Sequence, residues 1–104
     1  MDRIGQLRKF IADRPDDPFP RYALALELKG SGDARGAAAE LEELLARKSD
    51  YLAAYLQLGM LLTSLDRPED AREILVRGQQ VARSQNNGHT LSELTQALET
   101  LPSR

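Results

Sequence analysis

The sequence predicts an all-α fold built from antiparallel helix pairs, with two full repeats flanked by a half-repeat helix at each end. Apolar residues recur at helical spacing, and no segment alternates as a half-buried strand does. Shifting the sequence by 34 residues superposes the apolar positions of one helix pair on those of the next. The segment 51–65, YLAAYLQLGMLLTSL, is apolar on nearly every side. A helix of this kind must be covered from more than one direction, as stacked repeats allow.

The composition is that of an ordinary globular protein, and we expect one domain over residues 1–104. The chain has 104 residues, of which 41% are hydrophobic and 29% are charged, and its formal net charge is −2. This charge gives no reason to expect a nucleic acid or an anionic membrane as a partner. There is no cysteine, which excludes disulfides, zinc–thiolate sites and thiol catalysis. Because the charged N-terminal segment lacks a signal-peptide pattern, we expect a cytoplasmic protein.

The first half of the chain is predicted to hold three helices. Residues 1–14 form a half-repeat helix that stops before a proline, and residues 18–49 form repeat 1. Prolines in the first turn begin the second helix, which ends at GSGD. There Gly30 and Gly32 suit a left-handed C-terminal cap, and Asp33 suits the N-cap of the third helix.

The second half is predicted to hold three more helices. Residues 51–85 form repeat 2, in which Pro68 opens the second helix. Residues 88–101 form a C-terminal capping helix, which we expect to cover the open apolar end of the helix before it. The sequence TLSE, residues 90–93, fits a capping box.

The internal repeat has matching positions in both helices of each pair. The shift places Leu24 on Leu58 in the first helix, Gly32 on Asp66 in the turn and Ala37 on Ala71 in the second helix. This pattern resembles the tetratricopeptide repeat, W-x2-L-G-x2-Y followed by A-x3-F and a closing proline. In the second copy, the motif slots hold Tyr55, Leu58, Gly59, Leu62, Ala71, Leu75 and Gly78. The chain is similar to small stand-alone bacterial members of that family, mostly of unassigned function.

Two departures from the family pattern stand out. In the first copy, Arg21 occupies the slot that usually holds tryptophan. Ser49 and Arg83 replace the closing proline, so the turn between units is not defined by the motif.

At Gly59 the missing side chain is expected to let a neighbouring backbone approach closely.

Helical angles divide the apolar segment into two faces. At about 100° per residue, one face gathers around Leu58, includes Tyr51, and is expected to be buried. The opposite face holds Ala53, Leu56, Met60 and Thr63, and the first helix of repeat 1 has Phe19, Tyr22, Leu26 and Lys29 at the same angles. The family resemblance implies that these faces line a concave surface that binds peptides or helices. The alternative is that tight curvature or the terminal helices bury them as core.

The resulting prediction is a non-catalytic protein–protein interaction module that binds a peptide or helix in an apolar concave groove. The alternative function is self-association, as a homodimer or assembly that uses the same face. Family members that bind chaperone tails hold a carboxylate with basic and polar side chains. Here Tyr22 and Leu26 take such positions and only Lys29 remains, which disfavours a clamp of that kind.

No catalytic, cofactor-binding or metal-binding residues are predicted, and we expect no enzyme activity and no cofactor. His89 is the only histidine, and Glu93 lies one helical turn further on. This pair has no third ligand or nucleophile beside it in the sequence. His89 is therefore expected to be a first-turn helix residue. The expected partner is a protein or peptide, or a second copy of the chain, with neither nucleic acid nor membrane.

Overall fold

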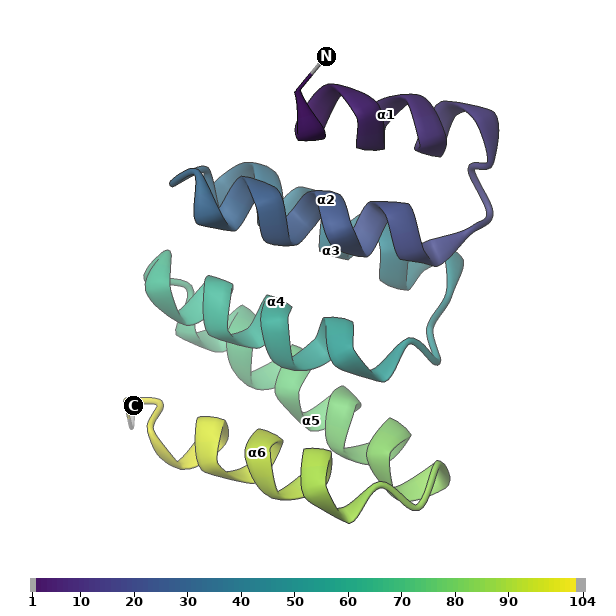
Figure 1. The fold of residues 1–104 in the computed structure, drawn as a ribbon. Helices are drawn as coiled ribbons and strands as arrows, with labels where there is room; N and C mark the ends of the chain where they lie inside the picture. The colour runs from purple at the N-terminus through teal and green to yellow at the C-terminus, as the bar shows by residue number, and fades with distance from the viewer. Residues whose placement is uncertain (1, 103–104) are drawn as a thin grey trace. The chain divides into compact units, whose positions relative to one another are not determined.

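Six α-helices joined by short turns make up residues 2–102, which are the residues described by this computed structural model (Figure 1). No strand occurs within this range. The predicted all-α fold is confirmed. The helices are α1 (Arg3–Asp13), α2 (Pro18–Gly30), α3 (Ala34–Arg47), α4 (Leu52–Ser64), α5 (Pro68–Ser84) and α6 (Gly88–Glu99).

The first of two compact units contains α1, α2 and α3 and extends to Tyr51. Helix α2 packs against both α1 and α3. It can do so because apolar residues occupy more than one side of it, with Leu24 and Leu28 both buried. The other helices contribute side chains such as Leu7 of α1 and Leu41 of α3, which are also buried. Burial of such side chains is the main favourable term in the stability of the unit.

The second unit begins at Leu52 and contains α4, α5 and α6. Helix α5 contacts α4 and α6, and α6 also contacts α4. Helix α6 therefore covers part of α4. Leu94 of α6 is fully buried, and it lies against Gly78 of α5, where an added Cβ would be 3.0 Å from its Cδ2 atom. Helix α6 thus packs against α5 within this unit, and its role as a capping helix stays a prediction.

Gly59 marks a close helix contact, but the approaching group differs from the prediction. A Cβ atom built on Gly59 would overlap the Leu75 side chain, with its Cγ atom only 2.6 Å away. The space left by the glycine is thus filled by a leucine side chain of α5 and not by a backbone. The same kind of contact recurs at Gly78, where a Cβ would lie 2.7 Å from the Cβ of Tyr55.

Three helices end with the same left-handed turn. The residues with positive φ are Gly32 (92°), Asp66 (60°) and Asn86 (55°), and in each turn the next residue donates a hydrogen bond to a carbonyl five residues earlier. These are the bonds of the Schellman motif. The predicted left-handed conformation is confirmed at Gly32 but was wrong for Gly30, which is the last residue of α2.

Helix starts follow the predicted cap at one place and depart from it at another. The Asp33 carboxylate accepts a hydrogen bond of 2.8 Å from the backbone N–H of Gly36, as expected for an N-cap. The predicted capping box at Thr90 was wrong, because α6 begins at Gly88, two residues before Thr90. Its N-cap is Asn87, whose side-chain oxygen accepts a 3.0 Å hydrogen bond from the N–H of Thr90. Asn and Thr are both good caps, and the turn at Asn86 decides between them.

Candidate functional site

In the first unit, α2 carries a row of large side chains on an exposed face. The helix begins at Pro18, and the Asp17 carboxylate caps it by accepting a 3.1 Å hydrogen bond from the N–H of Phe19. Phe19 is 62% exposed and Leu26 is 40% exposed, whereas Leu24 on the opposite side is fully buried. Tyr22 is half-buried and Lys29 is exposed. The four α2 residues predicted for the groove are therefore all at least partly accessible.

Tyr22 forms an aromatic pair with Tyr51, the last residue of the first unit. The ring centroids are 5.3 Å apart and the ring planes are tilted by 47°. Tyr51 is held by a 3.2 Å hydrogen bond from its N–H to the carbonyl of Lys48. Burial raises the pKa of the Tyr51 phenol above 10.0, and the negative charge of Asp17 raises that pKa further. The phenol of Tyr51 therefore lies within electrostatic reach of the α2 N-cap.

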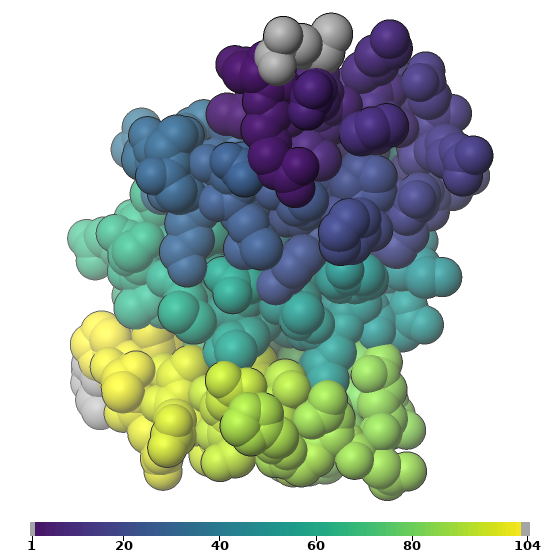
Figure 2. Space-filling view, in the orientation of Figure 1, coloured from purple at the N-terminus to yellow at the C-terminus, as the bar shows by residue number. Residues whose placement is uncertain are grey.

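In the second unit, the exposed face of α4 has no charge. The helix contains no charged residue, and the atoms of α4, coloured teal, are visible at the surface in Figure 2. Met60 is 44% exposed, Ala53 and Thr63 are exposed, and Leu56 is half-buried. The Thr63 hydroxyl donates a 2.8 Å hydrogen bond to the carbonyl of Gly59 in its own helix. This face therefore offers mainly apolar contact to a ligand.

Each predicted face is thus solvent-accessible within its own unit. The residues opposite it on α4 are buried, including Ala54, Leu58 and Leu62. Phe19, Leu26 and Met60 are exposed, so these three side chains do not form core. That the two sets of residues bind one ligand remains a prediction.

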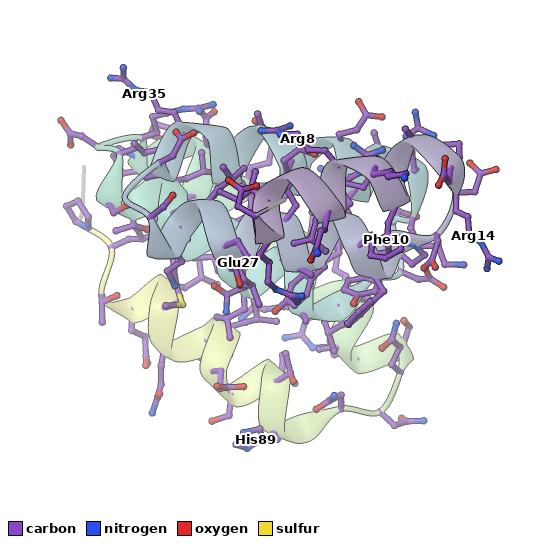
Figure 3. The ribbon with its side chains drawn as sticks, turned by 45° about the horizontal axis from the view of Figure 1, so that its top comes forward. Arg8, Phe10, Arg14, Glu27, Arg35 and His89 are labelled. Carbon is purple, nitrogen blue, oxygen red and sulfur yellow. The ribbon has the colours of Figure 1, made fainter. Side chains whose placement is uncertain are left out.

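Sequence patterns missed three features of the surface. Tyr51 was placed with the buried residues around Leu58, yet it is half-buried and pairs with Tyr22. It precedes the first residue of α4, so a helical angle does not apply to it. Phe10 on α1 and Val76 on α5 are also exposed, at 58% and 41%. Phe10 and Arg14 lie near the end of α1 in Figure 3.

His89 lies in the first turn of α6, on the outer surface of the helix (Figure 3). Its Nε2 atom is 3.6 Å from the Oε1 atom of Glu93, and its side chain is 87% exposed. Within residues 2–102, no group of three or more His, Cys, Asp or Glu side chains is arranged to hold a metal ion. An exposed pair of this kind contributes little to stability. It offers no constellation for catalysis.

None of the described helices combines the length and the apolar composition that crossing a bilayer requires.

Comparison with known proteins places these features in a repeat family. The family model described as tetratricopeptide repeat matches residues 28–94, which is more than half of the chain. Among curated proteins, none matches the chain.

Solved structures give matches over most of the chain. A crystal structure of a tetratricopeptide repeat domain protein from Salinibacter ruber is 42% identical, covers 80% of this chain and 93% of its own, and has a TM-score of 0.76. A solution structure of a Salinibacter ruber domain protein is also 42% identical, with 82% and 86% covered and a TM-score of 0.76. The TPR2B domain of yeast Sti1, in a complex described with pHsp70, is 18% identical and covers 92% of this chain and 77% of its own, with a TM-score of 0.86. At that identity, the yeast structure supports the fold alone.

Proposed function

This chain belongs to the tetratricopeptide repeat family, and from that premise we propose that it is a non-catalytic module that binds a peptide or helix of another protein. The binding residues are those of the exposed α2 face (Phe19, Tyr22, Leu26, Lys29) and of the exposed α4 face (Ala53, Leu56, Met60, Thr63). The ligand is held by apolar contact, with Lys29 as the single charged group in the set.

One observation carries the proposal. Five large hydrophobic side chains are exposed in the described part of the chain, and three of them, Phe19, Leu26 and Met60, lie at the helical positions predicted to bind. Exposed apolar side chains often mark an interaction site where they form a patch, and each of the two units contributes such residues on its own helix. Met60 suits such a site because its flexible thioether adapts to different partners.

The fold supports a peptide ligand in general terms. The yeast Sti1 domain, which shares this fold, is in a complex with pHsp70. Helical repeats bind helices or extended peptides without any catalytic group. For this chain we favour apolar contact over a carboxylate clamp, since large apolar or aromatic side chains stand where basic ones would be needed.

The alternative is that the same faces join two copies of the chain. Apolar faces of this kind close homodimers as readily as they bind foreign peptides. Light scattering over a range of protein concentrations separates the two functions. A mass that stays at one chain supports a foreign partner, whereas a mass that doubles with concentration supports self-association.

The test of the binding face uses variants with similar exposure. Leu26→Glu and Met60→Glu each put a charge at a proposed contact, and Val76→Glu puts one at a residue of equal exposure on α5. We expect the first two variants to lose partner capture from a lysate of the source organism, or self-association, while Val76→Glu retains it. All three should melt near the temperature of the unmodified protein. Equal capture by all three variants would place binding elsewhere.

A further inference from the structure

We propose that the partner is a basic peptide, and that one of its arginine side chains binds against Tyr22, Tyr51 and Phe19 with its charge facing the carboxylate of Asp17. This inference deepens the proposed function and rests on it, because Phe19 and Tyr22 belong to the α2 face. It adds the chemical class of the ligand, which an apolar face alone does not define.

Two aromatic rings meet in the first unit, and a third lies about one helical turn before them on α2. Tyr22 and Tyr51 form a tilted pair with a centroid distance of 5.3 Å, so two ring faces meet at an angle. Phe19 precedes Tyr22 by three residues on α2 and therefore lies on the same side of the helix. Its ring is 62% exposed. A guanidinium group is attracted to the faces of such rings and stacks on them readily.

A carboxylate caps the same helix, two residues before Phe19. Asp17 is fixed at the N-cap of α2 through its bond to the N–H of Phe19. After burial, the negative charge of Asp17 is the second cause that raises the pKa of the Tyr51 phenol. One of its oxygens serves the cap, and a carboxylate can accept several further hydrogen bonds. Asp17 makes no ion pair within residues 2–102, whereas the neighbouring Asp16 is 3.5 Å from Arg47.

At the start of α2 the Asp17 carboxylate favours a cation over an anion, and Lys29 lies two helical turns beyond Tyr22 on the same helix. Rings alone bind apolar groups as well as cations, but a carboxylate beside them repels an anionic ligand. Arginine suits this site better than lysine, since its planar group can stack on a ring and donate to Asp17 at the same time. An apolar residue next to that arginine would contact Leu26, one helical turn beyond Tyr22 on the same face.

The experiment uses the complete chain and two acetylated, amidated pentapeptides, Ala-Leu-Arg-Leu-Ala and the same peptide with citrulline in place of arginine. Citrulline has nearly the same shape and no charge. Ring resonances of Phe19, Tyr22 and Tyr51 are followed by NMR during each titration. We expect the arginine peptide to shift these resonances and to bind at least about threefold more tightly than the citrulline peptide, as a cation on aromatic rings implies.

Two variants check the assigned groups. Asp17→Asn keeps the N-cap, so it should preserve the fold and weaken arginine-peptide binding about threefold while leaving citrulline-peptide binding unchanged. Asp16→Asn, which removes the neighbouring carboxylate that pairs with Arg47, should bind like the unmodified protein. Equal binding of the two peptides would overturn the cation site while leaving the apolar binding face intact. If neither peptide shifts the ring resonances, the cation site is also overturned. The lysate experiment with Leu26→Glu and Met60→Glu tests the proposed function separately.

Discussion

The guanidinium of Arg21 is buried on α2 and pairs with the carboxylate of Glu40 on α3, with 3.1 Å between Nη1 and Oε1. Arg21 occupies the family slot of a tryptophan, so a charged side chain fills a position that is usually apolar. Its long stem supplies apolar contact and Glu40 supplies the opposite charge. Arg8 of α1 lies 4.0 Å from the other oxygen of Glu40, so the three helices of the first unit meet around one carboxylate.

Glu40→Ala should therefore destabilise the protein markedly. Removing one partner leaves the other charge buried without compensation, and the partial exposure of Glu40 limits the cost to about 2–3 kcal/mol. Glu43→Ala is the matched control, because Glu43 makes an exposed pair with Arg47 on the same helix, worth about 0.3–0.5 kcal/mol. Urea denaturation monitored by circular dichroism measures both. Similar losses in the two variants would show that Arg21 does not depend on Glu40.

Gly59→Ala should destabilise the protein although alanine is the better helix former. An added Cβ would overlap the Leu75 side chain, and overpacking in a core typically costs about 1–3 kcal/mol. The control is Gly30→Ala at the end of α2, where a Cβ meets nothing within 4 Å. That variant should be neutral or stabilised by up to about 1 kcal/mol. Thermal melts of both variants measure these changes. A higher melting temperature for Gly59→Ala would mean that Leu75 moves aside without loss of stability.

The helices and the outward faces were predictable because both follow from local rules. Helical angles place residues within one helix, which is why Leu26 and Met60 were correctly expected to face away from Leu24 and Leu58. Caps were less predictable. Asn87 and Thr90 are both competent N-caps, and only the turn that precedes α6 selects Asn87.

Pairings between helices could not be derived from periodicity. The slot pattern marked Arg21 as a departure but did not identify Glu40 as its partner, because that pairing depends on how α2 and α3 pack. Tyr51 was misplaced for a related reason. It lies outside α4, and its position is fixed by a backbone bond to Lys48 and by the ring of Tyr22.

Asp66→Gly should stabilise the protein. Asp66 has a φ of 60°, a conformation that is costly for side-chain-bearing residues, and the first repeat has Gly32 at the same point. The gain should be about 0.5–1 kcal/mol after the greater chain entropy of glycine is counted. Gly32→Ala is the reverse experiment, because it adds a side chain at a residue with positive φ. Its Cβ would meet nothing within 4 Å, so any loss there reports the conformational cost alone. A fall in melting temperature for Asp66→Gly would show that the aspartate makes a compensating interaction.

Alkaline pH should weaken the fold through Tyr51. Its pKa is raised in the folded protein, chiefly by burial and then by Asp17, so the folded state holds the phenol proton more tightly than the unfolded chain. Its contribution is therefore complete below pH 10.0, the unfolded pKa, and is lost as the pH rises through the folded pKa. Urea denaturation at several values between about pH 8 and 11 should show this decline, and Tyr51→Phe should show a smaller one.

Asp17→Asn should lower the Tyr51 pKa towards its ordinary value without removing the effect of burial, as NMR titration of the Tyr51 ring would reveal. An unchanged Tyr51 titration in Asp17→Asn would mean that the carboxylate does not act on this phenol, and it would also remove one support for the cation site.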